Sequence, residues 1–541
     1  MLPRLKLPPS PAALALIAAT FILPGLAWHD PWKTHDAVGQ GIVHGMWVTG
    51  DLLVPRVAGA LWMFDPPLYH WIATAFGALL RPLLEFHAAA RLASGLFVAL
   101  AFCLIYRAAR DWQPEVERRP SSAAAAMLLV LGAVGLMVHA HEALPELAGL
   151  AALCGALAAL PHVLRHPVAS GLAFGVALGL ASLASGWIAP LALALAAIAA
   201  RFVCPAWRAP AASRFLLVAL PLALLIGASW PLALALRAPQ AFAEWRALTL
   251  PSYLRPVDGL RFYLVTGSWF TWPAWPLALW TAWYLRHRWR DPQLFLPAAS
   301  VLLMLAGFSA WGATEDVDLI LFLGPLALVA THAIFIMRRG AVGALDWFGV
   351  LVFAFFSLAV WFFYLVLVLG VPAPVARNLE RLAPGYVPQF SILAVLFALA
   401  LAGGWLYLIF FAERAPTRSL ARWAGGIVLL WGTAAMLLIP WVDYQKSYRS
   451  VALQLRERIP AGAGCIAQKA LGVSQAAALD YHAGLRALPF EPLRPDACRV
   501  LLVQGTPQEE IDDPPSARWR KVAEVGRPGD RVERYRLYLH K

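Results

Sequence analysis

Long apolar blocks alternate with short polar connections over residues 11–441. Many blocks run for about 18 residues or more, the length that a helix needs to cross a hydrocarbon core of about 30 Å. The pattern therefore predicts a bundle of about thirteen membrane-spanning helices. The predicted spans are 11–28, 87–107, 122–139, 143–163, 168–184, 186–202, 214–236, 268–286, 294–311, 318–337, 344–370, 389–411 and 422–441.

The stretch 66–84 is also apolar enough to span, but counting it would reverse the orientation of every later loop. Its Tyr-His-Trp sequence at 69–71 suits a helix at the level of the lipid headgroups. We therefore predict an interfacial helix here, within a long outer loop at 29–86. A second outer loop, rich in aromatic and charged residues, is predicted at 237–267.

The pattern changes near residue 443, where the apolar blocks stop and charged residues become frequent. A helix-like segment at 473–483 is followed by the strand-like sequence RVLLVQ at 499–504. We predict a transmembrane domain over 1–442 and a small α/β domain over 443–541, outside the membrane.

Composition and charge support a membrane protein. Of the 541 residues, 60% are hydrophobic and 14% charged, against roughly 45–50% and 25% in soluble domains. The net charge of +13 is explained by basic loops that mark the cytoplasmic side, so nucleic-acid binding is not indicated. With the N-terminus in the cytoplasm and the C-terminus outside, every strongly basic short loop falls on the cytoplasmic side: 107–119, 165, 201–214, 286–290, 338–339 and 414–422.

The five cysteines contain no CxxC metal signature. Cys465 and Cys498 both lie in the tail. They can pair if the tail faces an oxidising compartment, and two unrelated thiols are the alternative.

Short motifs in the first outer loop indicate chemistry. They are Trp32, His35-Asp36, Gly50-Asp51, Pro55 and the sequence PPLYHW at 66–71. Their layout resembles the first outer loop of bacterial polyprenyl-phosphate-dependent glycosyltransferases, a group that includes the lipid A aminoarabinose transferase and protein O-mannosyltransferases. The resemblance implies a GT-C architecture, and it continues in RLAS at 91–94, Pro145-Glu146, Trp272-Pro273 through Trp280, and PLAL at 325–328.

The resemblance also implies catalytic residues. In that family an Asp-Glu pair opens the loop helix, and the Asp is thought to act as the base on the acceptor. An ungapped alignment puts His35 at the Asp position and Asp36 at the Glu position, whereas a gap of one residue makes Asp36 the base. We expect Asp36 to be the base in either case, with His35 as its partner. Glu146, after a proline, matches the family's second acid.

Departure of a lipid phosphate requires positive charge close to the leaving oxygen. Where the family has Glu-Lys before the paired prolines, this chain has Phe64-Asp65, and Asp318 stands where a tyrosine is common. Glu315, Asp316 and Asp318 are predicted to form a solvated outer loop, and a position in the lining of the cavity is the alternative. The substrate-binding candidates are Asp65, Lys33, Arg56, Arg246, Arg255, Arg261 and Tyr263. For each arginine, an anchor at the membrane interface is the alternative.

We therefore predict an inverting glycosyltransferase in the bacterial inner membrane. It would move a sugar from a polyprenyl-phosphate carrier to lipid A, another envelope glycan or a protein at the periplasmic face. This chemistry requires no metal or organic cofactor, although a divalent metal at His139, His141 and Glu142, beside Glu146, is an open alternative. Two other classes stay open: a transporter or flippase, and a non-catalytic binder of a lipid-linked glycan.

Overall fold

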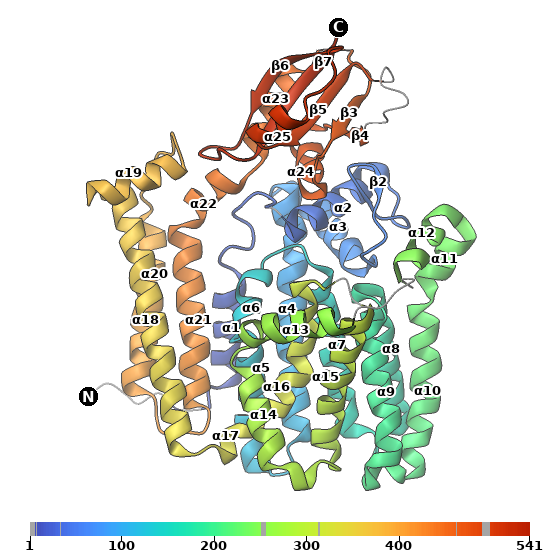
Figure 1. Ribbon diagram of the computed structural model, residues 1–541. Helices are drawn as coiled ribbons and strands as arrows, with labels where there is room; N and C mark the ends of the chain where they lie inside the picture. Colours follow the sequence, from blue (N-terminus) through green and yellow to red (C-terminus); the bar gives the residue numbers. More distant parts are fainter. Residues whose placement is uncertain are drawn as a thin grey trace.

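A computed structural model describes residues 6, 8–32, 34–249, 256–311, 314–460, 462–489 and 498–541. It shows a bundle of long helices with a small mixed sheet at one end (Figure 1). Within these residues, nine helical segments are long and apolar enough to cross a membrane. They are Phe86–Trp112 (α4), Pro145–His162 (α7), Pro167–Ser185 (α8), Pro210–Arg237 (α10 and α11), Pro292–Trp311 (α15), Asp316–Ile336 (α16 and α17), Arg339–Leu369 (α18), Ile392–Phe411 (α20) and Arg418–Leu437 (α21).

The remaining predicted spans are formed by shorter helices. Two of them are α1 (Pro11–Ile22) and α9 (Ile188–Val203). The predicted span 122–139 is broken after Leu131, and 268–286 is broken at Pro273, whose ring nitrogen cannot donate a hydrogen bond. The two breaks lie side by side, and a hydrogen bond joins them: Val134 N donates to Trp272 O at 3.2 Å. The helices involved are α5 (Arg119–Leu131), α6 (Val134–His139), α13 (Pro256–Phe270) and α14 (Ala274–Tyr284).

The predicted interfacial stretch forms α3 (Leu68–Leu80), which packs against α4. Tyr69 and His70 do not lie at a lipid surface, since both side chains are fully buried. The Tyr69 hydroxyl bonds the Ser94 hydroxyl at 2.7 Å. The expectation that these two side chains are interfacial is therefore wrong, because both are buried within the protein and Tyr69 bonds to α4.

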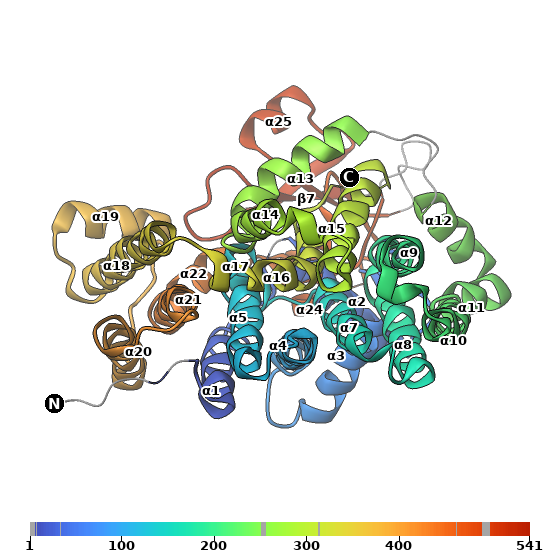
Figure 2. The same ribbon diagram turned by 90° about the horizontal axis from the view of Figure 1, so that it is seen from below.

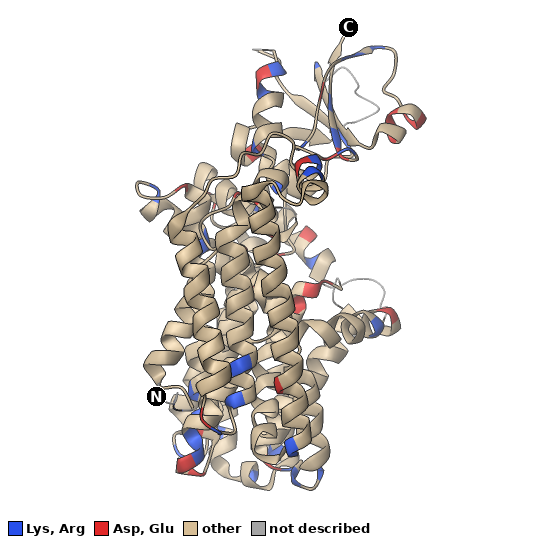
Figure 3. Ribbon diagram, turned by 90° about the vertical axis from the view of Figure 1, so that its left-hand side faces the viewer, with Lys and Arg blue, Asp and Glu red and all other residues tan. Residues whose placement is uncertain are grey.

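Seen from below, the helices fall into three groups (Figure 2). A central cluster contains α4, α5, α7 and α16, with α18, α20 and α21 on one side and α8, α9 and α10 on the other. Charged residues are sparse along the middle of the long helices, and Lys and Arg gather toward the end remote from the sheet (Figure 3). The predicted membrane bundle of mainly α class is confirmed.

Residues 449–541 form what we call the sheet region. Its strand order is β4-β3-β5-β7-β6, in which β3 runs parallel to β4 and β5, and the other pairs are antiparallel. The predicted helix 473–483 and the predicted strand at 499–504 are both present, and Cys465 forms a disulfide with Cys498. The elements are α23 (Arg449–Arg458), β3 (Ile466–Lys469), α24 (Val473–Ala483), β4 (Ala487–Pro489), β5 (Val500–Gly505), α25 (Pro507–Asp512), β6 (Trp519–Val525) and β7 (Arg534–His540).

The sheet region rests on the first loop through α24, which packs on α2 (His35–Thr49). A Cβ atom at Gly41 would lie 2.7 Å from Ala477 Cβ, so the two helices approach closely only because Gly41 has no side chain. The Tyr481 hydroxyl accepts a hydrogen bond from His87 N at 3.2 Å. Figure 1 shows α2, α3 and α24 meeting beneath the sheet.

Candidate active site

A polar cavity of about 450 Å³ lies where the first loop, the start of α7 and the sheet region meet. The membrane-side wall contains side chains that can accept or hold a proton. The opposite wall comes from residues 470–475 and Gln504 of the sheet region. The polar side chains that line the cavity are Thr34, His35, Asp65, Glu146, Glu315, Ser474, Gln475 and Gln504.

His35 is the first residue of α2 and lies among carboxylates. Its Nε2 is 3.7 Å from Asp316 Oδ1, and its Nδ1 is 4.0 Å from Glu315 Oε2. The Asp316 carboxylate outweighs burial and raises the pKa of His35 to about 9. Asp316 also lies 3.7 Å from His139 Nε2, and His139 Nδ1 lies 2.6 Å from Glu142 Oε2. Glu315 and Asp316 are thus partly solvated, as expected, while Glu315 also lines the cavity and Asp316 contacts His35 from outside the lining.

Asp65 and Glu146 are the two carboxylates of the inner wall. Asp65 Oδ2 accepts a hydrogen bond from Trp62 Nε1 at 2.7 Å, and no described group donates to Oδ1. Burial raises the pKa of Asp65 to about 6, above the usual range for an aspartate. Glu146 lies in the first turn of α7, and its buried Oε2 has no hydrogen-bond partner among the described residues. Both groups are thus available to a ligand in the cavity.

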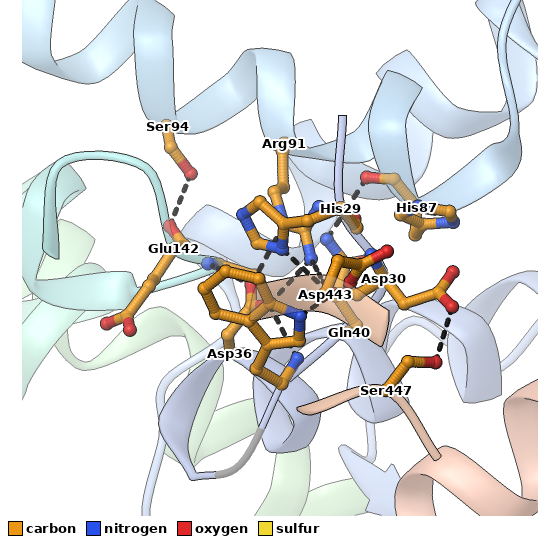
Figure 4. Close-up of polar contacts among 12 residues, drawn as sticks. His29, Asp30, Asp36, Gln40, His87, Arg91, Ser94, Glu142, Asp443 and Ser447 are labelled. Carbon is orange, nitrogen blue, oxygen red and sulfur yellow. Dashed lines mark hydrogen bonds and ion pairs between the residues drawn. The ribbon is translucent and has the colours of Figure 1, made fainter. Parts of the chain in front are cut away.

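Asp36 lies beside the cavity but does not line it. Its Oδ1 accepts from Arg91 Nε at 3.0 Å and Ala143 N at 2.9 Å, and its Oδ2 accepts from Arg91 Nη2 at 2.6 Å and Trp32 N at 3.2 Å (Figure 4). Burial alone would raise the pKa of Asp36, but Arg91 outweighs burial and lowers it. The carboxylate therefore fixes the start of α2 against α4 and the turn before α7.

Arg91, on α4, also fixes the first loop in place. It donates from Nη1 to His29 O at 2.7 Å and from Nη2 to Asp30 O at 3.1 Å. Three residues on, Ser94 Oγ donates to Glu142 O at 2.7 Å. The RLAS motif thus holds both chain segments that carry the site.

The other predicted substrate-binding residues are scattered. Arg56, on β1 (Arg56–Val57), donates to Gly59 O at 3.4 Å, and Arg261 is exposed on α13. Tyr263 is buried and donates from its hydroxyl to Asp318 Oδ2 at 2.5 Å. None of the three lines the polar cavity. Lys33 and Arg255 lie outside the described residues.

Arg246 lines an apolar groove of about 490 Å³ between α8, α9, α10 and α12 (Pro239–Thr249). The groove shares Trp187 and Trp245 with a smaller cavity of about 200 Å³, which also contains Asp318. Phe64 lines both this smaller cavity and the polar cavity. Phe64 therefore lies between the smaller cavity and the polar cavity.

Two groups of side chains contain possible metal ligands. His141 Nε2 donates to Phe21 O at 2.9 Å, so this imidazole points away from His139 and Glu142. Among the described residues, the ligand atoms of Asp30, Glu85 and His87 lie within 4.8 Å of one another. Arg449 Nη2 lies 2.6 Å from Asp30 and 2.7 Å from Glu85, so the guanidinium of Arg449 already pairs with both carboxylates of this group.

Comparison with known proteins decides the fold. The structure matches ArnT from Cupriavidus metallidurans bound to undecaprenyl phosphate, with a TM-score of 0.71 and 18% identity over 96% of this chain and 97% of that one. This is the GT-C fold. The apo form of the same ArnT matches with a TM-score of 0.68 over 96% of each chain, again at 18% identity. The GT-C architecture predicted from the sequence motifs is confirmed, whereas no protein-family profile and no curated protein sequence matches the chain.

The GT-C fold accounts for residues that the sequence did not single out. Ser474, Gln475 and Gln504 line the cavity from more than 400 positions along the chain from His35. No motif marks them, because they meet the first loop only when the sheet region docks. The sequence does show Glu315 and Asp316 as part of an acidic cluster between two spans. It does not show that His35 and His139 are their partners, because these histidines lie far away in the sequence.

Proposed function

We propose that the chain is a membrane glycosyltransferase that moves a sugar from a polyprenyl-phosphate donor to an acceptor hydroxyl, with inversion at the anomeric carbon. The observation that carries the proposal is the polar cavity with Asp65, Glu146 and His35, which shares Phe64 with the smaller cavity beside the apolar groove. We place the protein in the bacterial inner membrane with the cavity on the periplasmic side. Nucleotide sugars in the cytoplasm cannot reach a cavity on that side. A donor that is embedded in the same bilayer can.

The groove between α8, α9, α10 and α12 is the proposed path of the donor's lipid chain. Among the described residues its lining is mostly apolar and includes one charged side chain, Arg246. Guanidinium groups suit phosphate oxygens because they donate two parallel hydrogen bonds. ArnT binds undecaprenyl phosphate, which supports a carrier of this kind here.

In the proposed reaction, Asp65 accepts the proton of the acceptor hydroxyl as the new glycosidic bond forms. The bond between the anomeric carbon and the phosphate oxygen breaks, and polyprenyl phosphate leaves. A base with a pKa of about 6 is matched to work near neutral pH. Glu146 orients the acceptor, and protonated His35 supplies positive charge to a site whose described lining contains no Lys or Arg.

This assignment moves the base from Asp36 to Asp65. All four hydrogen bonds to the Asp36 carboxylate come from the protein, so no lone pair is directed to an acceptor. Asp36 is instead a positioning residue for His35. His35, at the family's Asp position in the ungapped alignment, is the member of the pair that lines the cavity.

The test uses purified full-length protein, a radiolabelled polyprenyl-phosphate sugar and vesicles from envelope extracts. We expect wild type to transfer label and Asp65→Asn to lose about 100-fold or more in rate, the usual contribution of general base catalysis. Donor binding should be unchanged in Asp65→Asn, and the control Glu457→Gln, at an exposed position on α23, should behave as wild type.

Two other outcomes would replace the proposal. If wild type binds the donor without transferring label to any acceptor, the protein is a binder of lipid-linked glycans, a function favoured by the lack of described Lys and Arg side chains in the cavity. If label crosses the bilayer while it stays on the carrier, the protein is a flippase.

A further inference from the structure

The sheet region forms one wall of the polar cavity. Residues 470–472 connect β3 to α24, and Ser474 and Gln475 lie in the first turn of α24. Gln504 reaches the same wall from the end of β5. The wall therefore faces Asp65 and Glu146 across the space in which an acceptor would react.

The partly buried carboxylate of Glu533 holds this wall in shape. Glu533 Oε1 accepts from Gln475 Nε2 at 2.8 Å and from Gln504 Nε2 at 2.7 Å, while Gln504 Oε1 accepts from Gly472 N at 2.8 Å. Three further side chains donate hydrogen bonds to the Glu533 carboxylate: Tyr535 at 3.0 Å, Tyr448 at 3.1 Å and Arg527 at 2.9 Å. Several hydrogen bonds that converge on one carboxylate restrict the motion of the side chains that donate them, which a binding wall requires.

The wall is also fixed relative to the membrane-side wall. The close contact of Gly41 with Ala477 sets the distance between α2 and α24. At the other end of α24, the Tyr481 hydroxyl bonds His87 Nδ1 at 2.9 Å. The two walls therefore form one built cavity.

The chemistry of the lining indicates the class of ligand. Asp65, Glu146 and Glu315 are carboxyl groups, and the described lining contains no Lys or Arg. His35 is the one described basic side chain there, and it is assigned to the donor, so a second anion, on the acceptor, has no described cation to pair with. Carboxylates accept hydrogen bonds from hydroxyls. Trp62 and Phe64 lie with ring centroids 4.9 Å apart, and Phe64 is 55% exposed, so aromatic surface is open to the apolar face of a sugar ring. A volume of about 450 Å³ is in the range of small-molecule sites.

We propose that residues 470–475 and Gln504 form the acceptor subsite, that its ligand is an uncharged sugar ring of a glycan, and that Glu533 is a positioning residue for this subsite. This rests on the proposed transferase function and assigns the acceptor end of it. The reacting group is then a sugar hydroxyl, and neither a phosphate nor a peptide side chain.

The experiment supplies wild type with a polyprenyl-phosphate sugar and three acceptors: a neutral trisaccharide on a lipid anchor, the same glycolipid with a phosphate ester, and a Ser/Thr peptide. We expect transfer to the neutral glycolipid. In Val473→Trp, which fills the cavity from an exposed position, the acceptor KM should rise because the ring occupies the space of the sugar. In Glu533→Gln it should rise about 10-fold, the loss of one or two hydrogen bonds. The donor Kd should stay unchanged.

Matched controls separate the subsite from general damage. Val522→Trp places the same side chain at an exposed position of β6, and Glu457→Gln removes a carboxylate from α23; neither residue lines the cavity. Preferred transfer to the phosphorylated glycolipid or to the peptide overturns the proposal. An unchanged acceptor KM in both variants, or a parallel loss of donor affinity, also overturns it.

A binding measurement distinguishes this proposal from the transferase proposal. If wild type transfers nothing, binding of the neutral trisaccharide to full-length protein is followed by saturation-transfer NMR. Binding that is lost in Val473→Trp and kept in Val522→Trp supports the subsite without the reaction. No binding to wild type refutes the subsite.

Discussion

Asp36 and Arg91 form an ion pair that is withdrawn from water, with 1% and 0% of their surfaces exposed. Removing one partner of such a pair leaves the other charge buried and unpaired. We expect Asp36→Asn to lower the free energy of unfolding by about 3–5 kcal/mol, measured by thermal unfolding in detergent. Asp258→Asn, an exposed aspartate in the first turn of α13, is the matched control and should change little. A stable but inactive Asp36→Asn would restore Asp36 as the base.

The pH dependence of transfer tests the proposed roles of Asp65 and His35. Asp65 acts when ionised, so the rate should rise as pH increases through about 6, its raised pKa. His35 acts when protonated, so the rate should fall as pH increases through about 9. We expect a bell-shaped plot of kcat/KM against pH, and loss of the alkaline limb alone in His35→Asn. An alkaline limb that persists in that variant would assign it to another group.

The sequence singled out His35 and Asp36 of the first loop as candidate site residues. It did not show which role each of them has. His35 and Asp36 are adjacent, and a displacement of one position in the alignment exchanges their roles. At the first turn of a helix, neighbouring side chains point about 100° apart, so only the structure shows that His35 enters the cavity and Asp36 enters the core. Arg91 appeared in the sequence as part of a motif, but its partner could not be read from spacing.

At the scale of elements, α2 is the helix that joins both walls. Its glycines allow close packing on two sides: a Cβ at Gly39 would overlap Ala143 O, and a Cβ at Gly41 would lie 2.7 Å from Ala477 Cβ. Gly41→Ala should push α24 away and cost about 1–3 kcal/mol. We expect faster hydrogen exchange in α24 and a higher acceptor KM.

The control for this change is Gly403→Ala, in α20, where an added Cβ meets nothing within 4 Å. It should have no effect on exchange or activity. Normal exchange in α24 of the Gly41→Ala variant would mean that the two helices can separate without loss, and the docking argument would fail.

Most of the long helices were predictable because length and apolarity are sufficient to identify a span. The breaks at residues 132–133 and 271–273 were not predicted, since an apolar window averages over a short interruption. Likewise, α3 has the composition of an interfacial helix, and only packing against α4 shows why Tyr69 is buried. In the sheet region, strong local patterns identified α24 and β5, whereas pairing with β7 depends on contacts remote in sequence.

At the scale of the whole molecule, the sheet region lies at one end of the helix bundle (Figure 1). We propose that the sheet region is periplasmic, in agreement with its disulfide and with basic loops at the other end (Figure 3). In a Cys103→Ser background, a membrane-impermeant maleimide should label Glu457→Cys on intact spheroplasts and Glu117→Cys only after lysis. The reverse pattern would invert the orientation.

The cavity unites Thr34 and Gln504, which lie near opposite ends of the chain. Translation delivers the membrane helices first and the second wall last. A nascent chain, or a product of premature termination before residue 470, would therefore carry the donor groove and Asp65 but no wall opposite them. Under the proposed function, completion of synthesis is thus a condition for transfer, because a chain that ends earlier lacks one wall of the cavity.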